Sequence, residues 1–431
     1  MYLTRFTIEN LRAIQKLEWK VPLKQAPGWH VILGDNGSGK SSVLRSIALA
    51  LVGPYEATAL RQDWEKWRRG NTAAGVQLSL ALDARYDRLK GKKPGGASLR
   101  QHVGIVAWRH GGPLGWSWGP GAEGRIESPL WESREGWFSA AFGPFRRFTG
   151  GNEEYEKLLD AYPRLARHLS VFDESVALTE GLKWLQQLQF KKLERDPEGR
   201  LLAPLMKFIN QPDFLPHRAH LEKISSREVL FVDGNGFRVP VEELSDGYRA
   251  VLSMTFELIR QLAAAYGPRK VFNPKDPTRV DVPGVVLIDE VDAHLHPTWQ
   301  RKVGLWFRKH FPKMQFIVTT HSPLVCQAAE EGTVWRLPRP GTAEEARQVT
   351  GVELERLVYG NVLDAYGTGV FGEGITRSER AKERLQRLAE LNMKELKKGL
   401  TPAERKEQAA LRASQPTAAM TLNASEARGR E

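Results

Sequence analysis

The chain has 431 residues, of which 41% are hydrophobic, so it can form one large α/β domain with insertions or two domains. Its one cysteine, Cys326, excludes an internal disulfide framework and fits a reducing compartment. The net charge of +12 favours nucleic acid, anionic lipid or an acidic protein as a partner, and nucleotide phosphates need part of that charge. Early charges interrupt any signal-peptide core and no apolar run could span a bilayer, so we expect a cytoplasmic protein without a membrane partner.

Three strands are expected around the first functional motif. Apolar and polar residues alternate over residues 2–8 and 17–21, which is typical of a pair of half-buried strands. An apolar run over residues 29–33 leads into Gly-Asp-Asn-Gly-Ser-Gly-Lys-Ser at residues 34–41, and a helical run opens at Ser42. A strand, a loop of this spacing and a helix together predict a P-loop that binds nucleotide phosphates.

Each part of this loop has a chemical reason. Glycines let backbone N–H groups turn toward phosphate oxygens, and the following helix adds the positive end of its dipole. Lys40 is placed to neutralise the β- and γ-phosphates, and the Ser41 hydroxyl to ligate Mg²⁺. We therefore predict ATP and Mg²⁺ as cofactors, with nucleotide contacts from Gly34, Asn36, Gly37, Ser38, Gly39, Lys40, Ser41 and Ser42.

The middle of the chain changes between strand and helix patterns. Residues 76–82 and 137–142 read as strands, whereas from Glu153 to about Ile209 apolar residues recur every three or four positions, as in helices. Two strands with a Gly-containing turn follow over residues 229–241, and then a helix over about 247–266. We expect an N-terminal ATPase lobe, a helical insertion, a C-terminal lobe and a basic helical tail, at residues 1–150, 151–224, 225–374 and 375–431.

A second functional motif follows Val285–Ile288, whose β-branched residues predict a buried parallel strand. A helix over 299–310 and a strand over 316–320 complete a βαβ unit. The carboxylates Asp289 and Glu290 then stand at the carboxyl end of a strand, beside the P-loop in an open parallel sheet. Asp289 is expected to hold the Mg²⁺ shell, and Glu290 to orient or deprotonate the attacking water.

Two further segments can contact phosphates. Leu244–Tyr248 precedes a helix, where Ser245 can act as N-cap and free N–H groups can bind an anion. His321 follows the next strand and can reach a γ-phosphate from the sheet edge, although a loop histidine with an ordinary hydrogen bond is the alternative. His294 and His296 lie beside carboxylates, but a zinc site needs further ligands and none of the usual ligand spacings occurs.

In this order the four motifs resemble those of the ABC-type ATPase superfamily, and more narrowly of its SMC/RecF-like branch. The resemblance covers residues 1–53 and about 225–330. It implies an α/β fold: a P-loop ABC-type ATPase head with a mixed sheet, a helical insertion between the lobes and a helical C-terminal tail. It also implies a head-to-head dimer that sandwiches two nucleotides, in which the signature motif of one subunit completes the P-loop of the other.

The resemblance also assigns residue roles. Glu290 and His321 match the catalytic glutamate and the switch histidine, and Ser245 and Gly247 match the signature motif. Arg12 stands where relatives place a basic residue near the nucleotide.

Two departures from the family pattern stand out. Asp246 occupies a signature position where many members have Gly. The glutamine of the family's Q-loop has no counterpart in residues 138–147, where Arg146 or Arg147 could take its place.

A narrower resemblance concerns the biological role. Residues 141–147, 364–368, 375–379 and 391–394 look like the ATPase of Septu-type and retron-associated antiphage defence systems. That resemblance implies a separate HNH-type nuclease as partner and, in some systems, DNA or a reverse-transcribed RNA–DNA. Two other classes stay open: a RecF-like DNA-repair clamp whose ATP cycle gates DNA binding, and a scaffold that binds ATP without turnover.

The tail from Thr376 is charged and helical, with more Lys and Arg than Asp and Glu. We expect an apolar stripe on this helix to dock on a neighbouring subunit or a partner, with packing on its own core as the alternative. The stripe comprises Ala381, Leu385, Leu388 and Leu396. Residues 417–431 are rich in Ala, Thr and Ser and are expected to be disordered.

Overall fold

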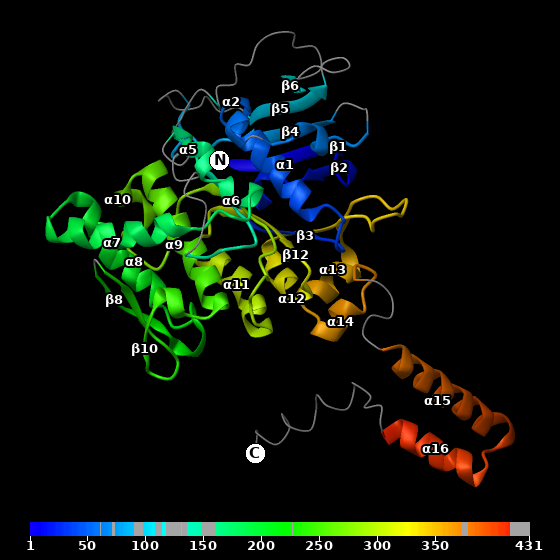
Figure 1. Ribbon diagram of the computed structural model, residues 1–431. Coiled ribbons are helices and arrows are strands. Elements are labelled where there is room, and N and C mark those ends of the chain that lie inside the picture. Colours follow the sequence, from blue (N-terminus) through cyan, green and yellow to red (C-terminus); the bar gives the residue numbers. More distant parts are fainter. Residues whose placement is uncertain are drawn as a thin grey trace. The chain divides into compact units, whose positions relative to one another are not determined.

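The computed structural model describes residues 1–60, 62–70, 74–89, 98–107, 114–117, 131, 136–148, 161–225, 227–371 and 378–413. The chain divides into two compact units, Met1–Ala365 and Tyr366–Glu431 (Figure 1). Within the described ranges no helix is both long enough and apolar enough to cross a membrane.

The first sheet is antiparallel, with five strands in the order β2-β1-β4-β5-β6. Its alternating side chains face the core on one side, where Phe6 stacks on Trp19 of the neighbouring strand with ring centroids 5.2 Å apart. The strands predicted over 2–8, 17–21 and 76–82 are thereby confirmed. The sheet consists of β1 (Tyr2–Leu11), β2 (Ile14–Lys20), β4 (Ala74–Ala81), β5 (Ser98–Ala107) and β6 (Leu114–Ser117).

The second sheet carries the predicted motifs and has six strands in the order β14-β13-β3-β12-β11-β7. Neighbouring strands are parallel except at the edge, where β14 runs antiparallel to β13, so the sheet is mixed as predicted. The sequence did not indicate β13 or β14, because such short strands carry no readable alternation. The bounds are β3 (Gly28–Leu33), β7 (Ser139–Phe142), β11 (Gly284–Ile288), β12 (Met314–Thr320), β13 (Gly332–Arg336) and β14 (Arg347–Val349).

Helix α1 (Lys40–Val52) starts in the P-loop and packs against strands of both sheets. Most of its residues are buried, because the helix has a sheet on each side rather than one solvent-facing side. Its Ile47 belongs to a single apolar cluster with Phe6 of the first sheet and Leu287 and Ile317 of the second. This core fixes the P-loop relative to the ends of β11 and β12.

The insertion after β7 is helical as predicted, although residues 153–160 lie outside the described ranges. Its longest helix, α7, packs against α9, the helix expected over 247–266. A small antiparallel sheet, ordered β10-β9-β8, confirms the predicted strand pair and adds β8. The elements are α5 (Pro163–Ala166), α6 (Leu169–Phe172), α7 (Thr179–Leu193), α8 (Leu202–Ile209), β8 (His220–Ile224), β9 (Val229–Val232), β10 (Arg238–Pro240) and α9 (Asp246–Tyr266).

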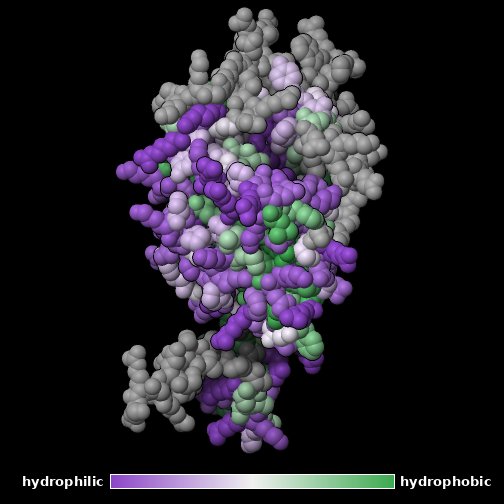
Figure 2. Space-filling view, turned by 90° about the vertical axis from the view of Figure 1, so that its left-hand side faces the viewer, coloured by the Kyte–Doolittle hydropathy of each residue, from purple (hydrophilic) through white to green (hydrophobic). Residues whose placement is uncertain are grey.

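The remaining helices of the first unit are mostly short. One of them, α10, follows α9 directly, and Pro268 occupies its favoured first helical position. The side of the unit on which α7, α8 and α10 lie is largely hydrophilic, with a hydrophobic area near its centre (Figure 2). The helices are α2 (Pro54–Ala57), α10 (Pro268–Val271), α11 (Pro297–His310), α12 (Pro323–Cys326), α13 (Gly351–Val358) and α14 (Val362–Tyr366).

The second unit contains a hairpin of two helices, α15 (Glu379–Lys398) and α16 (Pro402–Ala413). Leu391, Leu400 and Leu411 are buried together between them, so α16 covers part of the apolar face of α15. Across the hairpin the Arg387 guanidinium pairs with Glu407 at 2.9 Å.

Of the predicted stripe, Leu388 packs against this cluster, whereas Leu396 is 84% exposed, so docking of its exposed part on another chain stays a prediction. Leu391 is the buried residue of α15, and five positions at about 100° each place Leu396 roughly 140° around the helix from it. Residues 375–377 and the supposedly disordered 417–431 lie outside the described ranges.

Candidate active site

The P-loop joins β3 to α1 and depends on glycine at two kinds of position. Gly37 and Gly39 have φ of +80° and +96°, in the left-handed region that other residues enter at a cost. A Cβ on Gly34 would come within 2.3 Å of the Ser38 hydroxyl, so that position is limited by space. The loop therefore keeps its curved shape only with this glycine pattern.

Two polar groups inside the loop are placed to contact a phosphate. Lys40 is buried, and its ammonium donates to the carbonyls of Gly34 at 2.8 Å and Asp35 at 3.0 Å. The Ser38 hydroxyl is also buried and has no hydrogen-bond partner among the residues that the structure describes. Since unsatisfied buried polar groups are costly, this cradle fits a phosphate group.

The other predicted P-loop residues surround this cradle. Asn36 and Gly37 are exposed at the tip of the loop, while Ser41 and Ser42 lie half-buried in the first turn of α1. The position of Ser41 beside Lys40 is compatible with its predicted role as a Mg²⁺ ligand.

The strand edge brings the acidic motif to the P-loop, as the parallel order of β3, β12 and β11 requires. Asp289 is buried, and its carboxylate accepts a 2.5 Å hydrogen bond from the Thr319 hydroxyl. The same hydroxyl accepts the Glu290 N–H at 2.8 Å. Thr319 therefore holds both acidic residues, a role that the sequence did not reveal because threonine is common in buried strands.

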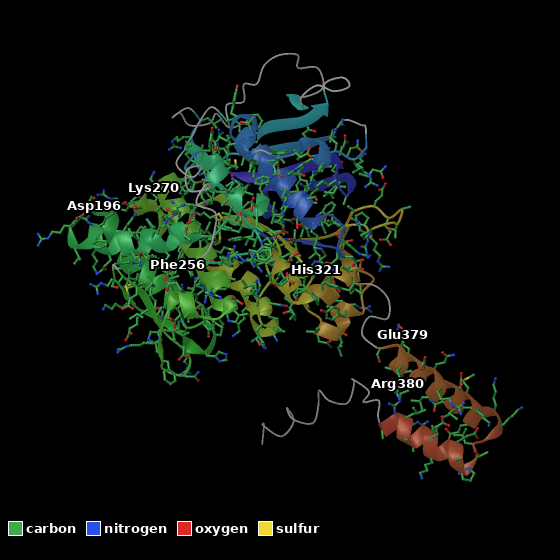
Figure 3. All side chains as sticks on the ribbon, viewed as in Figure 1. Asp196, Phe256, Lys270, His321, Glu379 and Arg380 are labelled. Atoms are coloured by element: carbon green, nitrogen blue, oxygen red, sulfur yellow. The ribbon has the colours of Figure 1, made fainter. Side chains whose placement is uncertain are left out.

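Charge effects place Lys40, His321 and the acidic residues in one site. Burial lowers the pKa of Lys40, while the charges of Glu290 and Asp289 oppose that shift. Burial also lowers the pKa of His321, and the neighbouring Lys40 cation lowers it further against the pull of Asp292. His321 is labelled in Figure 3, in the part of the first unit where α12 follows β12.

The segment after Glu290 is bonded to the segment after β12. The Thr320 hydroxyl donates to Asp292 at 2.5 Å, and the Ser322 hydroxyl donates to the Gln300 side chain at 2.7 Å. Gln300 in turn donates to the Leu295 carbonyl at 2.9 Å. These bonds fix the backbone on either side of His321.

Arg12 lies in the turn between β1 and β2, next to the P-loop. Its guanidinium stacks over the Trp67 ring at 4.4 Å, and burial followed by repulsion from Arg45 lowers its pKa. A Cβ on Gly39 would lie 3.3 Å from Ala13, which shows how closely this turn approaches the loop. Arg12 therefore stands where an anion beside the P-loop would relieve its repulsion from Arg45.

Ser245 and Gly247 lie apart from the P-loop. Ser245 is exposed at the N-cap position of α9, but its side chain makes no capping hydrogen bond. Gly247 packs so closely on the His294 carbonyl that a Cβ would come within 2.9 Å of it. Both residues line a mainly apolar cavity of about 750 Å³ with Leu295 and Trp299, whereas no P-loop residue lines that cavity.

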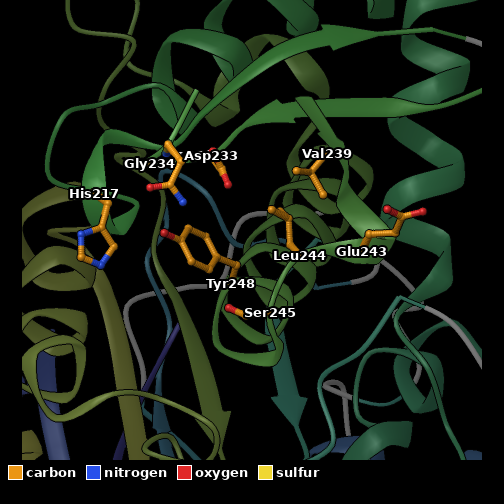
Figure 4. Close-up of a pocket in the computed structure, with 9 residues that line it drawn as sticks. His217, Asp233, Gly234, Val239, Glu243, Leu244, Ser245 and Tyr248 are labelled. Atoms are coloured by element: carbon orange, nitrogen blue, oxygen red, sulfur yellow. Dashed lines mark hydrogen bonds between the residues drawn. The ribbon is translucent and has the colours of Figure 1, made fainter. Parts of the chain in front are cut away.

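A second cavity, of about 440 Å³, also borders the α9 N-terminus (Figure 4). Its lining includes Ser245, Tyr248, His217 and the Asp233–Asn235 turn. The Tyr248 hydroxyl donates to the Pro216 carbonyl at 3.1 Å, and burial raises its pKa. The start of α9 therefore borders two cavities.

The histidines considered for zinc have other surroundings. His296 occupies the N-cap position of α11, and its ring bonds the Thr298 hydroxyl at 3.0 Å. Across the described ranges no group of three or more His, Cys, Asp or Glu side chains is arranged to hold a metal ion. Mg²⁺ needs no such cage, because it usually takes one or two carboxylates together with substrate phosphates and water.

Comparison with known proteins gives several matches. A family model described as "AAA domain, putative AbiEii toxin, Type IV TA system" matches residues 30–327. The "Retron Ec83 probable ATPase" of Escherichia coli is 37% identical over 124 residues, which are 29% of this chain and 22% of that protein. The "Septu protein PtuA" of Bacillus mycoides is 22% identical over 357 residues, which are 77% of this chain and 40% of that protein. The chain spans less than half the length of these relatives.

Solved structures also match. A structure described as the "SmcHead bound to the C-winged helix domain of ScpA" is 14% identical and covers 83% of this chain and 100% of its own, with a TM-score of 0.49. A RecF structure is 12% identical and covers 81% and 98%, with a TM-score of 0.42. Because the family model spans the P-loop, both acidic residues and His321, and matches well over half of the sequence, this chain belongs to that AAA-domain family.

Proposed function

We propose that this protein is an ATPase that hydrolyses ATP to ADP and phosphate. The observation that carries the proposal is one sheet edge that holds a buried P-loop lysine, two acidic residues and a histidine whose charges influence one another. Family membership agrees with this, since the matched region contains all four.

In this proposal each residue has a separate task. Lys40 would leave the two carbonyls it bonds and contact the β- and γ-phosphates, since it forms no salt bridge with any residue that the structure describes. Glu290 would orient water for in-line attack and accept its proton, and His321 would contact the γ-phosphate. Ser41 and Asp289 would hold Mg²⁺, which when bound neutralises charge on the phosphate oxygens.

We further propose that the site is completed by a second copy of the chain. Ser245 and Gly247 stand at an exposed helix N-terminus, which is an anion-binding element, and they line a cavity separate from the P-loop. A head-to-head dimer would bring the α9 N-terminus of one copy to the nucleotide of the other.

For the biological role we propose a switch ATPase of antiphage defence that controls a partner effector, an HNH-type nuclease. The support is the similarity to relatives named as a retron ATPase and a Septu protein, together with the motif resemblance. DNA or a reverse-transcribed RNA–DNA would be a further partner, which the +12 net charge favours. The same charge favours the alternative, a RecF-like clamp, which strong and salt-sensitive duplex binding by the purified protein alone would support.

The proposed reaction is tested with Glu290→Gln. This variant should bind ATP with unchanged affinity and hydrolyse it about 10²–10⁴-fold more slowly, because it loses the base that positions and deprotonates water. Glu355→Gln, at an exposed position on α13, serves as the matched control and should keep the wild-type rate. Wild-type turnover by Glu290→Gln would remove the catalytic assignment.

A further inference from the structure

We propose that Arg146 is a positioning residue for ATP hydrolysis, which holds the backbone turn that carries Glu290 in the shape needed for attack. The inference rests on the proposed function, because it assigns Arg146 a task only if Glu290 acts on the water. It goes beyond the expectation that Arg146 or Arg147 replaces the missing Q-loop glutamine, since Arg146 points at the backbone after β11.

The contacts of Arg146 are unusually concentrated. Its side chain is buried, with the residue 5% exposed, and one guanidinium nitrogen donates to the Gly143 carbonyl at 3.0 Å and to the Asp289 carbonyl at 2.9 Å. The other terminal nitrogen donates to the Glu290 carbonyl at 3.1 Å and to the Val291 carbonyl at 3.4 Å. One side chain thereby binds three successive carbonyls of the acidic motif.

The turn needs such a partner because its backbone is strained. Glu290 has φ of +46°, in the left-handed region, which a residue with a side chain enters only at a cost. In this conformation the carbonyls of residues 289–291 all lie within hydrogen-bond distance of one guanidinium, whose several donors satisfy them. Strained residues of this kind persist only where the surroundings hold them, and they are common at catalytic sites.

Thr319 and Arg146 hold this turn from different groups. Thr319 bonds the Glu290 N–H and the Asp289 carboxylate, whereas Arg146 bonds the carbonyls. Neither residue bonds the Glu290 carboxylate, so the carboxylate is left for the substrate while its backbone is fixed on both sides. In this way the backbone of the base is held in position, while neither residue neutralises its carboxylate.

The chemistry of the position favours arginine over lysine. A guanidinium spreads its donors over a planar fork, whereas an ammonium is a compact point charge on a flexible stem. Burial lowers the pKa of Arg146 to about 10, and the charges of Asp289, Asp292 and Glu290 oppose that shift, so the group stays protonated near neutral pH. The buried cation is therefore a permanent part of the site.

The next residue provides a matched control. Arg147 is exposed, and its backbone carbonyl accepts the Leu178 N–H at 2.8 Å, a bond that a side-chain change leaves in place. Arg146→Met and Arg147→Met thus make the same chemical change one residue apart, on opposite sides of the loop.

The first measurement compares ATP affinity with turnover. Arg146→Met should lower kcat about 10- to 100-fold, a part of what loss of the base itself would cost, and should change the Kd of ATP with Mg²⁺ less than threefold. Arg147→Met should leave both unchanged. If Arg146→Met does not fold, as judged by circular dichroism, Arg146→Lys keeps the charge and most of the volume and should lower kcat at least fivefold.

A double-mutant cycle separates positioning from general support of the fold. In a Glu290→Gln background, adding Arg146→Met should slow the residual hydrolysis less than threefold, because the carboxylate that Arg146 positions is already gone. The inference would be overturned if the losses of kcat in the two single variants multiplied in full in the double variant. A wild-type kcat for every Arg146 variant that folds would also overturn it. A Glu290→Gln protein that is fully active would instead overturn the proposed function on which the inference rests.

Discussion

The P-loop edge and the N-terminus of α9 differ in how many of their polar side chains are hydrogen-bonded within the chain. At the P-loop, Lys40 is buried, its ammonium is bonded, and Asp289 and Glu290 are held by Thr319. At α9, Ser245 is exposed, caps nothing with its side chain and borders two cavities. The P-loop edge is organised for a ligand within one copy of the chain. The α9 N-terminus is exposed, as expected of an element that contacts a second copy.

Lys40→Ala should have the largest effect on nucleotide binding, because it removes the only cation of the P-loop. We expect the affinity for ATP with Mg²⁺ to fall at least about 100-fold, as for the loss of one partner of a buried charge pair, which costs about 2–5 kcal/mol. Isothermal titration calorimetry measures it. Affinity within threefold of the wild type would mean that this loop is not the nucleotide site.

Ser245→Arg should affect turnover and leave binding alone. A bulky cation at the α9 N-terminus should block approach to a second copy and lower kcat about 100-fold. The Kd of ATP should stay within threefold, since no P-loop residue lines the cavity that Ser245 borders. Ser378→Arg is the matched control, because Ser378 is also an exposed N-cap serine, on α15. A normal kcat in Ser245→Arg would contradict the proposal that the α9 N-terminus contacts the nucleotide of a second copy.

Acid should lower the stability of the first unit, because two of its histidines are buried. His30, on β3, bonds Thr333 and the Ala26 carbonyl, and burial lowers its pKa from 6.5 to about 4. His168 is likewise buried beside Ser139, and its pKa is lowered to about 3. In both cases the unfolded chain binds a proton more readily than the folded one, so stability is complete above pH 6.5 and falls as pH drops below it.

At pH 5.5 each of these histidines should remove about 1.4 kcal/mol of unfolding free energy relative to pH 7.5. Urea unfolding at the two pH values measures the change, and NMR titration of the His30 ring identifies its source. A His30 ring that is already protonated in the folded protein at pH 5.5 would rule out this contribution.

Removal of the tail should have the smallest effect on the nucleotide site. A chain ending at Gly374 lacks the α15–α16 hairpin, which forms its own unit, and should bind ATP within twofold of the full-length affinity. Because the apolar face of α15 is only partly covered by α16, we expect that chain to lose higher assembly or partner binding. Unchanged oligomer mass by light scattering, together with unchanged recruitment of the nuclease, would show that the tail does not dock.

The elements around the site could be predicted because their patterns are local. The glycines of the P-loop and the apolar runs before Lys40 and Asp289 each predict a local conformation. The parallel order of the strands then brings these segments together. The roles of Thr319 and Arg146 could not be predicted, since each depends on a partner far away in sequence. What covers Leu396 could not be predicted, because apolar spacing alone does not say which side of a helix its neighbour covers.

The central claim, a site shared between two copies, is tested most directly by mixing Lys40→Ala with Ser245→Arg. Each protein alone should be inactive, because every site in it carries one lesion. A mixed dimer has one site with both lesions and one site with the intact Lys40 of one copy and the intact Ser245 of the other. We predict that hydrolysis reappears on mixing and rises with the fraction of mixed dimer. A mixture no more active than the sum of its two components would contradict the shared site.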